Sequence, residues 1–317
     1  MTELQRIAKL EQEVKNIMNN MKVPNAPKVA TNHNKPFRPS PQRPQPQQPL
    51  QQNTVKNIDP INKNLSDKKR YGFKPDLPDQ RDFRFESLQL KPHLPASVDL
   101  RATCTPVKDQ GALGSCTSNA FASAVEFLEN KDKIKPEINM SRLFIYYNER
   151  VLEGTVRSDS GASLRDGIKT LVSQGCCPET EWPYIISKFE IKPTITCYTD
   201  GAKHIVQSYY RISTLNDMKT CLASGFPFVF GFTVYESFES NQVAATGIVP
   251  MPAHNEQVLG GHAVMAVGYD DTTQRYLVKN SWGTSWGMKG YFTIPYTYLT
   301  NPNLASDMWY ISKAKGF

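Results

Sequence analysis

Apolar residues in the middle of the chain recur every three or four positions, the spacing that places them on one face of an α-helix. Three stretches share this pattern: residues 117–130, 141–150 and 163–173. The third opens with Ser163, and Asp166 follows three positions later, a pair that suits a helix N-terminal cap. The pattern therefore predicts three helices in this part of the chain.

The second half of the chain has short apolar runs separated by glycine and polar turns, which indicates β-strands. Four runs qualify: residues 226–235, 262–270, 275–282 and 290–294. Helices followed by strands predict an α+β fold with a helical lobe, a strand-rich lobe and a cleft between them. We place this globular domain at residues 98–317.

The N-terminal part follows other patterns. Residues 1–23 carry an a/d stripe of apolar residues (Ile7, Leu10, Val14, Ile17 and Met21), which predicts an amphipathic heptad helix. It would either self-associate through residues 1–22 or dock on the globular domain. Residues 24–57 are rich in proline and glutamine and are expected to be a disordered linker. Residues 58–97 are polar with scattered aromatic residues, and we interpret them as an extended strap.

The net charge of +7 is unevenly distributed. Residues 1–75 carry 14 Lys/Arg and 5 Asp/Glu, whereas residues 76–317 carry 23 and 25. The basic segment is either a solvated tail or a contact for acidic partners, nucleic acid or an anionic surface. The sequence has no apolar run of 18 residues, and its N-terminus is too charged for a secretory signal. These features predict an intracellular, cytoplasmic protein without a transmembrane segment.

Six cysteines are present, and none has the C-x-x-C spacing of common zinc sites. We therefore expect no metal and no cofactor. A chain of this length without a signal peptide favours free thiols in a reducing compartment. The pairing state of five of them stays open (Cys104, Cys176, Cys177, Cys197 and Cys221).

The cysteine with a candidate chemical role is Cys116, in the stretch Gln110-Gly-Ala-Leu-Gly-Ser-Cys116. It lies where a glycine-containing turn becomes a helix. The helix N-terminus favours negative charge, so a thiol at this point tends toward the nucleophilic thiolate. Gln110, six residues earlier, can turn its side-chain NH₂ toward the same point as the Cys116 N–H, which would make an oxyanion hole.

A thiolate nucleophile needs a base, and His262 is the candidate because it opens an apolar strand behind two glycines. The predicted strands 262–270 and 275–282 form a hairpin, and pairing them about Asp271 sets His262 opposite Asn280. The asparagine oxygen would then accept a ring N–H and fix the imidazole tautomer. Trp282 follows closely and is large enough to cover that bond.

Three motifs in this order resemble those of the papain-like cysteine peptidases. They are Gln110–Cys116, Gly261-His-Ala-Val-Met-Ala-Val-Gly268 and Asn280-Ser-Trp-Gly-Thr-Ser-Trp-Gly287. The resemblance covers about residues 98–312, and its style is closest to compact bacterial and giant-virus cathepsin-B-like members. It implies a papain-like fold with a helical lobe and a β-barrel-like lobe. If the chain is viral, the virion becomes a second expected location.

The resemblance also implies roles by position. Cys116 corresponds to the nucleophile, His262 to the acid/base, Asn280 to the orienting residue and Gln110 to the oxyanion donor. Trp282 corresponds to the tryptophan that shields the Asn–His pair. Three further residues correspond to substrate-binding positions: Gly161 in the wall of the cleft, Trp286 on its primed side, and Asp307 near the floor of the main specificity pocket.

Two residues near the nucleophile depart from the family pattern. Leu113 stands where secreted members usually have a disulfide cysteine, and Thr117 replaces the usual aromatic residue after the nucleophile. The first departure agrees with a reducing compartment. The second alters the wall of the site.

The sequence thus predicts a cysteine-type peptidase, expected to be an endopeptidase that cleaves polypeptides through a thioester acyl-enzyme. We expect a latent form in which the strap acts as a propeptide over the cleft. The alternatives are a non-catalytic binding or scaffold protein on the same fold, and an acyl-transferase or ligase that uses the same site.

Overall fold

The computed structural model describes residues 71–85, 93–133 and 138–312. The chain divides into two units, Met1–Pro60 and Ile61–Phe317, and all described residues belong to the second. The heptad helix predicted at 1–23, the linker at 24–57 and the first part of the strap lie outside the described residues. None of the helices in the described ranges is long and apolar enough to cross a membrane.

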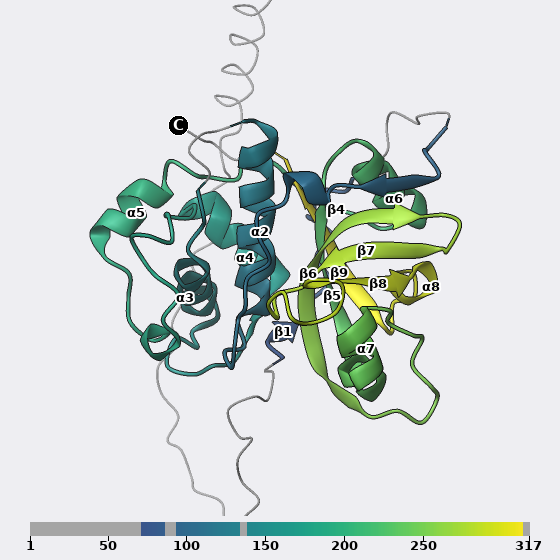
Figure 1. Ribbon diagram of the computed structural model, residues 1–317. Helices are drawn as coiled ribbons and strands as arrows, with labels where there is room; N and C mark the ends of the chain where they lie inside the picture. The colour runs from purple at the N-terminus through teal and green to yellow at the C-terminus, as the bar shows by residue number, and fades with distance from the viewer. Residues whose placement is uncertain (1–70, 86–92, 134–137, 313–317) are drawn as a thin grey trace, which may run out of the picture. The chain divides into compact units, whose positions relative to one another are not determined.

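Helices of the first half gather on one side of this unit and the sheet on the other (Figure 1). The helical lobe contains α2 (Cys116–Lys131), α3 (Arg142–Glu153), α4 (Leu164–Ser173), α5 (Ile195–Gly201) and the 3-10 turns η1 (Arg101–Thr103) and η2 (Ile186–Lys188). The three predicted helices are confirmed within a few residues. Ser163 caps α4 by accepting a hydrogen bond from the Asp166 N–H at 3.2 Å, as its sequence predicts.

The second half forms an antiparallel sheet in the order β4-β9-β5-β6-β7-β8, with β2 paired to β6. Its strands are β2 (Ser97–Asp99), β4 (Tyr209–Arg211), β5 (Phe228–Tyr235), β6 (Val258–Asp270), β7 (Arg275–Lys279), β8 (Tyr291–Pro295) and β9 (Ala305–Ile311). Around it lie α6 (Leu215–Ala223), η3 (Glu236–Glu239), α7 (Asn241–Thr246) and α8 (Tyr296–Leu299). The predicted α+β class is confirmed. Among the described strands β4 does not pair with β8, so the expected barrel-like lobe is an open sheet.

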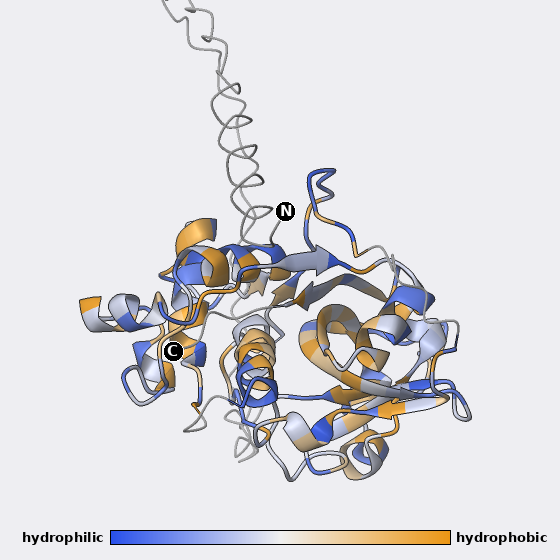
Figure 2. Ribbon diagram, turned by 90° about the horizontal axis from the view of Figure 1, so that it is seen from above, coloured by the Kyte–Doolittle hydropathy of each residue, from blue (hydrophilic) through white to orange (hydrophobic). Residues whose placement is uncertain are grey.

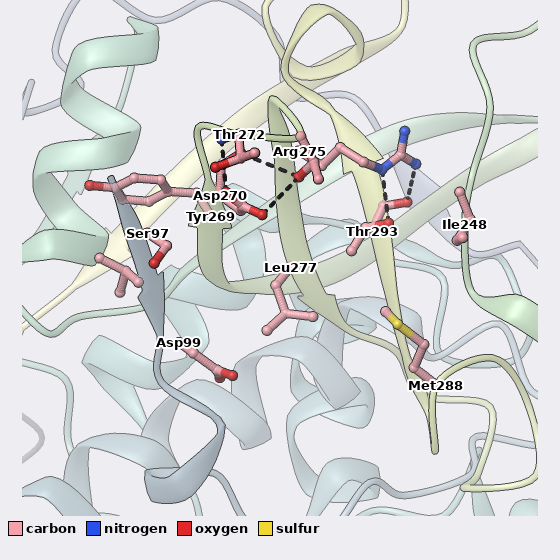
Figure 3. A pocket seen from close by; sticks show the side chains of 12 residues that line it. Ser97, Asp99, Ile248, Tyr269, Asp270, Thr272, Arg275, Leu277, Met288 and Thr293 are labelled. Carbon is pink, nitrogen blue, oxygen red and sulfur yellow. Dashed lines mark hydrogen bonds between the residues drawn. The ribbon is translucent and has the colours of Figure 1, made fainter. Parts of the chain in front are cut away.

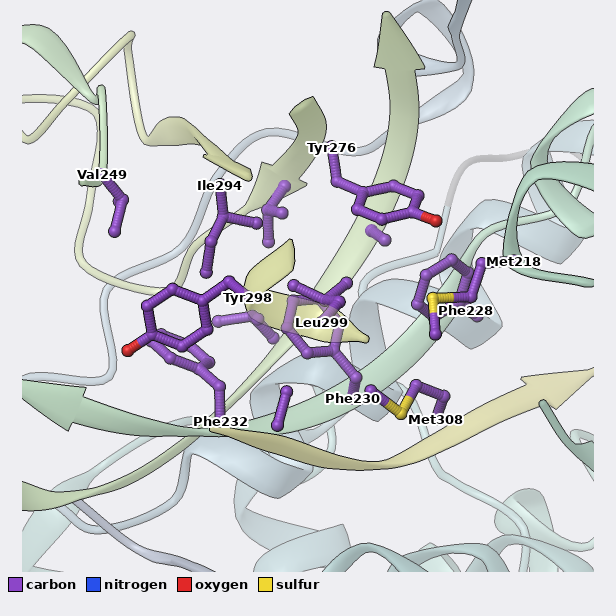
Figure 4. Close-up of a cluster of buried hydrophobic side chains, with 14 of the residues drawn as sticks. Met218, Phe228, Phe230, Phe232, Val249, Tyr276, Ile294, Tyr298, Leu299 and Met308 are labelled. Carbon is purple, nitrogen blue, oxygen red and sulfur yellow. The ribbon is translucent and has the colours of Figure 1, made fainter. Parts of the chain in front are cut away.

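Both faces of the sheet are buried, which explains why its strands are continuous apolar runs. On β5, Phe228, Phe230 and Phe232 point into one cluster with residues of β7, β8, α6 and α8 (Figure 4). Val229 of the same strand belongs to a second cluster that reaches α2 on the other face. Figure 2 shows hydrophobic residues recurring along the helices and strands, while several connecting loops are hydrophilic.

Helix α2 lies against the sheet at close range because its contact face is built from small residues. Ala120 and Ala124 pack with Ala263 and Met265 of β6 in the second cluster. All residues of α2 from Cys116 to Glu129 are buried. The start of α2 is therefore held by the core on every side.

The first described stretch of the strap, residues 71–85, lies against the rest of this unit. Its short strand β1 (Phe73–Lys74) pairs in parallel with β3 (Ala162–Ser163). Farther along, Arg211 donates hydrogen bonds to three carboxylates: Asp76 at 2.9 Å, Asp82 at 2.8 Å and Asp307 at 2.7 Å. Asp76 and Asp82 belong to the strap, whereas Arg211 and Asp307 belong to the sheet. These hydrogen bonds therefore attach the strap to the sheet.

Replacing Phe230 by alanine should lower the free energy of unfolding by about 3–5 kcal/mol, because a fully buried ring is lost and a cavity is left. Denaturant titration of the full chain, followed by tryptophan fluorescence, measures this change. Ile195→Ala serves as the control, since Ile195 is 80% exposed and its loss should change stability by less than about 0.5 kcal/mol. Similar losses for both variants would contradict the packing described.

Candidate active site

The turn before α2 delivers Cys116 to the first position of the helix. Gly111 has a φ of +58°, a left-handed conformation that glycine adopts without strain. Ser115 is the N-cap residue, and Cys116 itself is 0% exposed. The backbone N–H of Ala263, the residue after His262, donates to the Cys116 sulfur. This contact ties the start of α2 to the strand that carries the histidine.

His262 and Asn280 meet as the sequence predicts, but through a different hairpin register. His262 Nε2 lies 2.8 Å from Asn280 Oδ1, and both residues are buried. The strands pair Met265 with Lys279 and, after a β-bulge, Asp270 with Arg275. The predicted pairing of His262 with Asn280 about Asp271 is therefore wrong. Asn280 lies just past the end of β7, where its side chain can turn back to the imidazole.

Aromatic rings cover the His262–Asn280 hydrogen bond. The Trp282 ring stacks on the imidazole, with ring centroids 5.1 Å apart and an interplanar angle of 30°. Trp286 packs edge-on against Trp282 at 5.2 Å, and Phe238 contacts both tryptophans. Trp282 is 4% exposed, so the bond beneath it is removed from bulk water. A hydrogen bond in such a low-dielectric place orients the imidazole more strongly than one exposed to water.

Ser281 connects the two amide residues of the site. Its hydroxyl donates to Gln110 Oε1 at 2.6 Å, and its N–H donates to Asn280 Oδ1 at 2.8 Å. Gln110 in turn donates from Nε2 to the Leu113 carbonyl at 3.0 Å, and its backbone N–H donates to the Ser281 carbonyl. Gln110 is thus fully buried and held at both ends of its side chain. Sequence reasoning missed Ser281, although it directly follows Asn280.

Two other residues brace the turn before the nucleophile, and neither was predicted in that role. Tyr184 donates its hydroxyl to the Gln110 carbonyl at 2.9 Å and also contacts the Ser115 hydroxyl. The Asp159 carboxylate accepts the Gly114 N–H at 3.0 Å and the Tyr146 hydroxyl at 2.6 Å. Both come from loops far away in sequence, so no local pattern could identify them.

The strap crosses the site at residues 71–73. The Tyr71 ring lies 6.1 Å from the rings of both His262 and Trp282, and its hydroxyl donates to Glu239. The Gly72 N–H donates to the Cys116 sulfur, while its carbonyl accepts the Ala162 N–H at 2.7 Å. A Cβ on Gly72 would lie 1.7 Å from the Gly114 carbonyl oxygen. Only glycine therefore fits between the wall and the nucleophile turn.

Burial raises the pKa of the Cys116 thiol to about 11. The backbone N–H groups of Ala263 and Gly72 oppose this shift, because they stabilise the thiolate, but desolvation is the larger effect. The sequence argument for a helix terminus that favours the thiolate is thus outweighed here. With the strap in place, Cys116 is protonated at neutral pH.

The predicted substrate-binding residues all lie next to the strap or the aromatic cover. Gly161 has a φ of +68°, and a Cβ there would lie 1.9 Å from the Gly72 carbonyl oxygen. Asp307 accepts hydrogen bonds from Arg211 and, at 2.9 Å, from the Asp76 N–H. Trp286 lies in the aromatic cover beside Trp282. Asp307 is thus already paired with an arginine of its own chain.

The two departures near the nucleophile have defined surroundings. Leu113 is 2% exposed and packs with Leu143 and Tyr146. Thr117 donates its hydroxyl to Glu149 Oε2 at 2.8 Å. Glu149 is fully buried, and desolvation raises its pKa to about 8, so this carboxyl is largely protonated at neutral pH.

A hollow of about 660 Å³ lies on the sheet lobe and is lined by residues of β2, β6, β7 and β8 (Figure 3). Its polar lining is engaged in structure, since Arg275 donates to the Thr293 hydroxyl and carbonyl, both at 2.8 Å. None of the predicted catalytic residues lines it. The hollow is therefore separate from the site around Cys116.

Comparisons with known proteins agree with this geometry. The family model described as papain family cysteine protease matches residues 94–311. A peptidase C1-like protein of Acanthamoeba polyphaga mimivirus is 49% identical over 214 residues, which cover 65% of this chain and 69% of that protein. Pro-cathepsin H of Bos taurus is 31% identical over 217 residues, covering 63% of this chain and 59% of that protein.

Solved structures give the same result. Xylellain, a cysteine protease from Xylella fastidiosa, superposes with a TM-score of 0.73 at 43% identity, covering 78% of this chain and 97% of that chain. A procathepsin B structure from Trypanosoma congolense has a TM-score of 0.59 at 23% identity and covers 74% of this chain and 82% of its own. The second likeness concerns the fold alone.

Replacing Ser281 by alanine should lower kcat about tenfold with little change in KM, because Gln110 loses one of the bonds that hold it. Steady-state cleavage of a fluorogenic peptide measures both constants. Ser285→Ala is the matched control, since Ser285 belongs to the same motif and is exposed. Equal kcat for the two variants would show that the link through Ser281 does not support catalysis.

Proposed function

This chain belongs to the papain family of cysteine peptidases, and we propose that it is an endopeptidase in which Cys116 is the nucleophile. His262 acts as the acid/base, Asn280 orients it and Gln110 supplies the oxyanion donor. The observation that carries these roles is the His262–Asn280 bond at 2.8 Å, covered by Trp282 and joined through Ser281 to Gln110. Polypeptides are the substrates.

The reaction follows from these positions. His262 accepts the Cys116 proton, and the thiolate attacks the carbonyl carbon of the scissile bond. The oxyanion of the tetrahedral intermediate is stabilised by the Gln110 side-chain NH₂ and the Cys116 N–H. His262 then protonates the leaving amine, which gives a thioester. It next removes a proton from water, and the hydroxide attacks the thioester to release the acid and restore the thiol.

We propose that the chain is made in a latent form with the strap as its inhibitor. Three contacts support this: Tyr71 over His262, Gly72 against the Cys116 sulfur and Phe73 buried beside them. The strap directs an N–H toward the sulfur, and its Gly72 carbonyl faces Ala162. An orientation of this kind blocks the nucleophile without offering it a carbonyl to attack.

Phe73 also indicates which substrates the released site accepts. Its ring is 8% exposed and lies against the backbone of two strands, where a Cβ on Gly231 would come within 2.0 Å of the ring. Gly261 borders the same ring, at 3.0 Å from its own Cβ position. When the strap leaves, it vacates a pocket of the size of an aromatic ring. We propose that substrates place an aromatic side chain there, with Asp307 near the floor of the pocket, and that Gly161 and Trp286 bind substrate at the wall and the primed side of the cleft.

The remaining assignments concern location and partners. We propose that the protein acts in a reducing, cytoplasmic environment, or in a virion if it is viral. The free state of all six cysteines supports this. Self-association through residues 1–22, and contact of the basic N-terminal segment with acidic partners or nucleic acid, remain predictions outside the described residues.

Replacing Gly72 by alanine should raise both peptide cleavage and iodoacetamide labelling of Cys116 at least about tenfold, because the new methyl group cannot fit beside Gly114. Rates are compared at pH 7 for the full chain and the variant. Adding Cys116→Ala should abolish cleavage. Leu77→Ala is the strap control, since Leu77 is 82% exposed and should leave both rates unchanged.

These outcomes separate the two proposals. If Gly72→Ala is no faster than the unchanged chain, the strap does not block the site. If the double variant with Cys116→Ala still cleaves peptides, Cys116 is not the nucleophile.

In the Gly72→Ala background, a peptide library should show preference for an aromatic residue at one substrate position. Adding Gly231→Val should reduce cleavage of those peptides at least about tenfold relative to peptides with alanine at that position, because the valine side chain fills the pocket. An unchanged profile would place the aromatic pocket elsewhere.

A further inference from the structure

A group of metal-ligating side chains lies in the helical lobe and has no part in the catalytic site. Cys177, Glu181 and Cys197 each bring one ligand atom, and the three atoms lie within 4.8 Å of one another. Both cysteines are 0% exposed. Ligands around a tetrahedral zinc ion stand about 3.3–3.8 Å apart, given Zn–S bonds near 2.3 Å. Small side-chain rotations therefore suffice to close this group around an ion.

Asp200 lies outside that group of three and pairs with Lys203, but it is the candidate for the fourth ligand. It stands three residues after Cys197 in α5, so both side chains leave the same face of the helix. Its carboxyl lies near that of Glu181. The four residues make two close pairs, Cys177 with Glu181 and Cys197 with Asp200, from two separate segments. Paired ligands from two segments are the usual construction of structural zinc sites.

One oxygen atom of this group lacks a partner that a bound cation would provide. Glu181 Oε2 is buried and has no hydrogen-bond partner. A divalent cation would supply a partner for this oxygen, as a buried polar atom requires.

The groups that surround the two cysteine sulfur atoms are also typical of a metal site. The Thr194 hydroxyl lies 3.2 Å from Cys197 Sγ, a position from which it can donate to a thiolate. Phe144, Trp182 and Tyr198 surround the two cysteines and exclude water. Two sulfur ligands in an apolar setting favour a soft cation such as zinc over magnesium or calcium.

We propose that Cys177, Glu181, Cys197 and Asp200 bind one zinc ion, which cross-links the turn after α4 to helix α5. Binding releases the protons of the two thiols to solvent and forms two Zn–S bonds. The sequence search for C-x-x-C spacing missed this site because half of its ligands are carboxylates. This proposal departs from the prediction that the chain binds no metal.

This cross-link would serve the active site, although it does not depend on the proposed function. The segment between the two ligand pairs, residues 182–196, carries Tyr184. That side chain braces the turn before Cys116 through the Gln110 carbonyl and the Ser115 hydroxyl. Arg142 stacks on its ring at 3.9 Å and fixes it from the other side. A zinc ion at the base of this segment would restrict the position of Tyr184.

The test uses the full chain carrying Cys116→Ala, which removes the reactive thiol and any self-cleavage. Elemental analysis after dialysis should give about one zinc per chain. Cobalt(II) added to the zinc-free protein should produce the sulfur-to-metal charge-transfer absorption of a thiolate-bound tetrahedral ion. Cys177→Ser and Cys197→Ser should each weaken zinc binding at least about 100-fold, and Glu181→Gln at least about tenfold.

Cys176→Ser is the matched control, because Cys176 is the adjacent residue, is equally buried and lies outside the ligand group. It should retain zinc. Circular dichroism of Glu181→Gln shows whether loss of metal occurs in a folded chain.

Three results would overturn the proposal. The first is a parent chain that holds no zinc and binds no cobalt through sulfur. The second is equal zinc retention by Cys176→Ser and Cys177→Ser. The third is a Cys177–Cys197 disulfide found by peptide mass analysis of the chain purified without reductant, which would make the pair a redox cross-link instead.

Discussion

The close packing of α2 against β6 is the constraint on which the active site depends. Small residues on the contact face of the helix let the two backbones approach, so the Ala263 N–H reaches the Cys116 sulfur. The helix is buried from Cys116 to Glu129 and cannot move without opening contacts on several sides. The distance between nucleophile and base is therefore set by the core and not by a loop.

Burying a whole helix requires its charged residues to be paired, and these pairs add further restraints. Glu126 is fully buried and forms an ion pair with Lys108. It also accepts hydrogen bonds from the Thr105 hydroxyl and the Met140 N–H. Glu129 meets His204 at its Nδ1. Breaking such a pair leaves an uncompensated buried charge, which costs about 3–5 kcal/mol. The polar interior of the helical lobe thus holds α2 in one position.

Local sequence patterns predicted the features that depend on interactions between residues near one another in the sequence. The helices, the strands and the Ser163 cap follow from periodicity and turn chemistry, whereas the His262–Asn280 contact was predicted through a hairpin register that the structure does not have. The predicted register was wrong because Asp270 pairs with Arg275, which centres the turn beyond Asp271. A β-bulge between Ala266 and Gly268 then changes the pairing by one residue. The roles of Tyr184 and Asp159 were not predicted for another reason: these residues reach the turn before Cys116 from loops 45 or more residues away in the sequence. The raised pKa of Cys116 also depends on tertiary burial, which the helix-terminus argument does not include.

In the proposed latent form, steric and chemical inhibition by the strap would have one common cause, the position of Gly72. Its N–H contacts the sulfur, its carbonyl pairs with Ala162, and the space that a side chain would need is filled by Gly114. These contacts exclude substrate, and they also exclude the water that would solvate a thiolate. In the proposed latent form, departure of the strap would open the cleft and let water solvate the thiolate, an effect larger than the loss of the Gly72 N–H that stabilises it. A latent form of this kind would have an unreactive, protonated thiol as well as a blocked cleft.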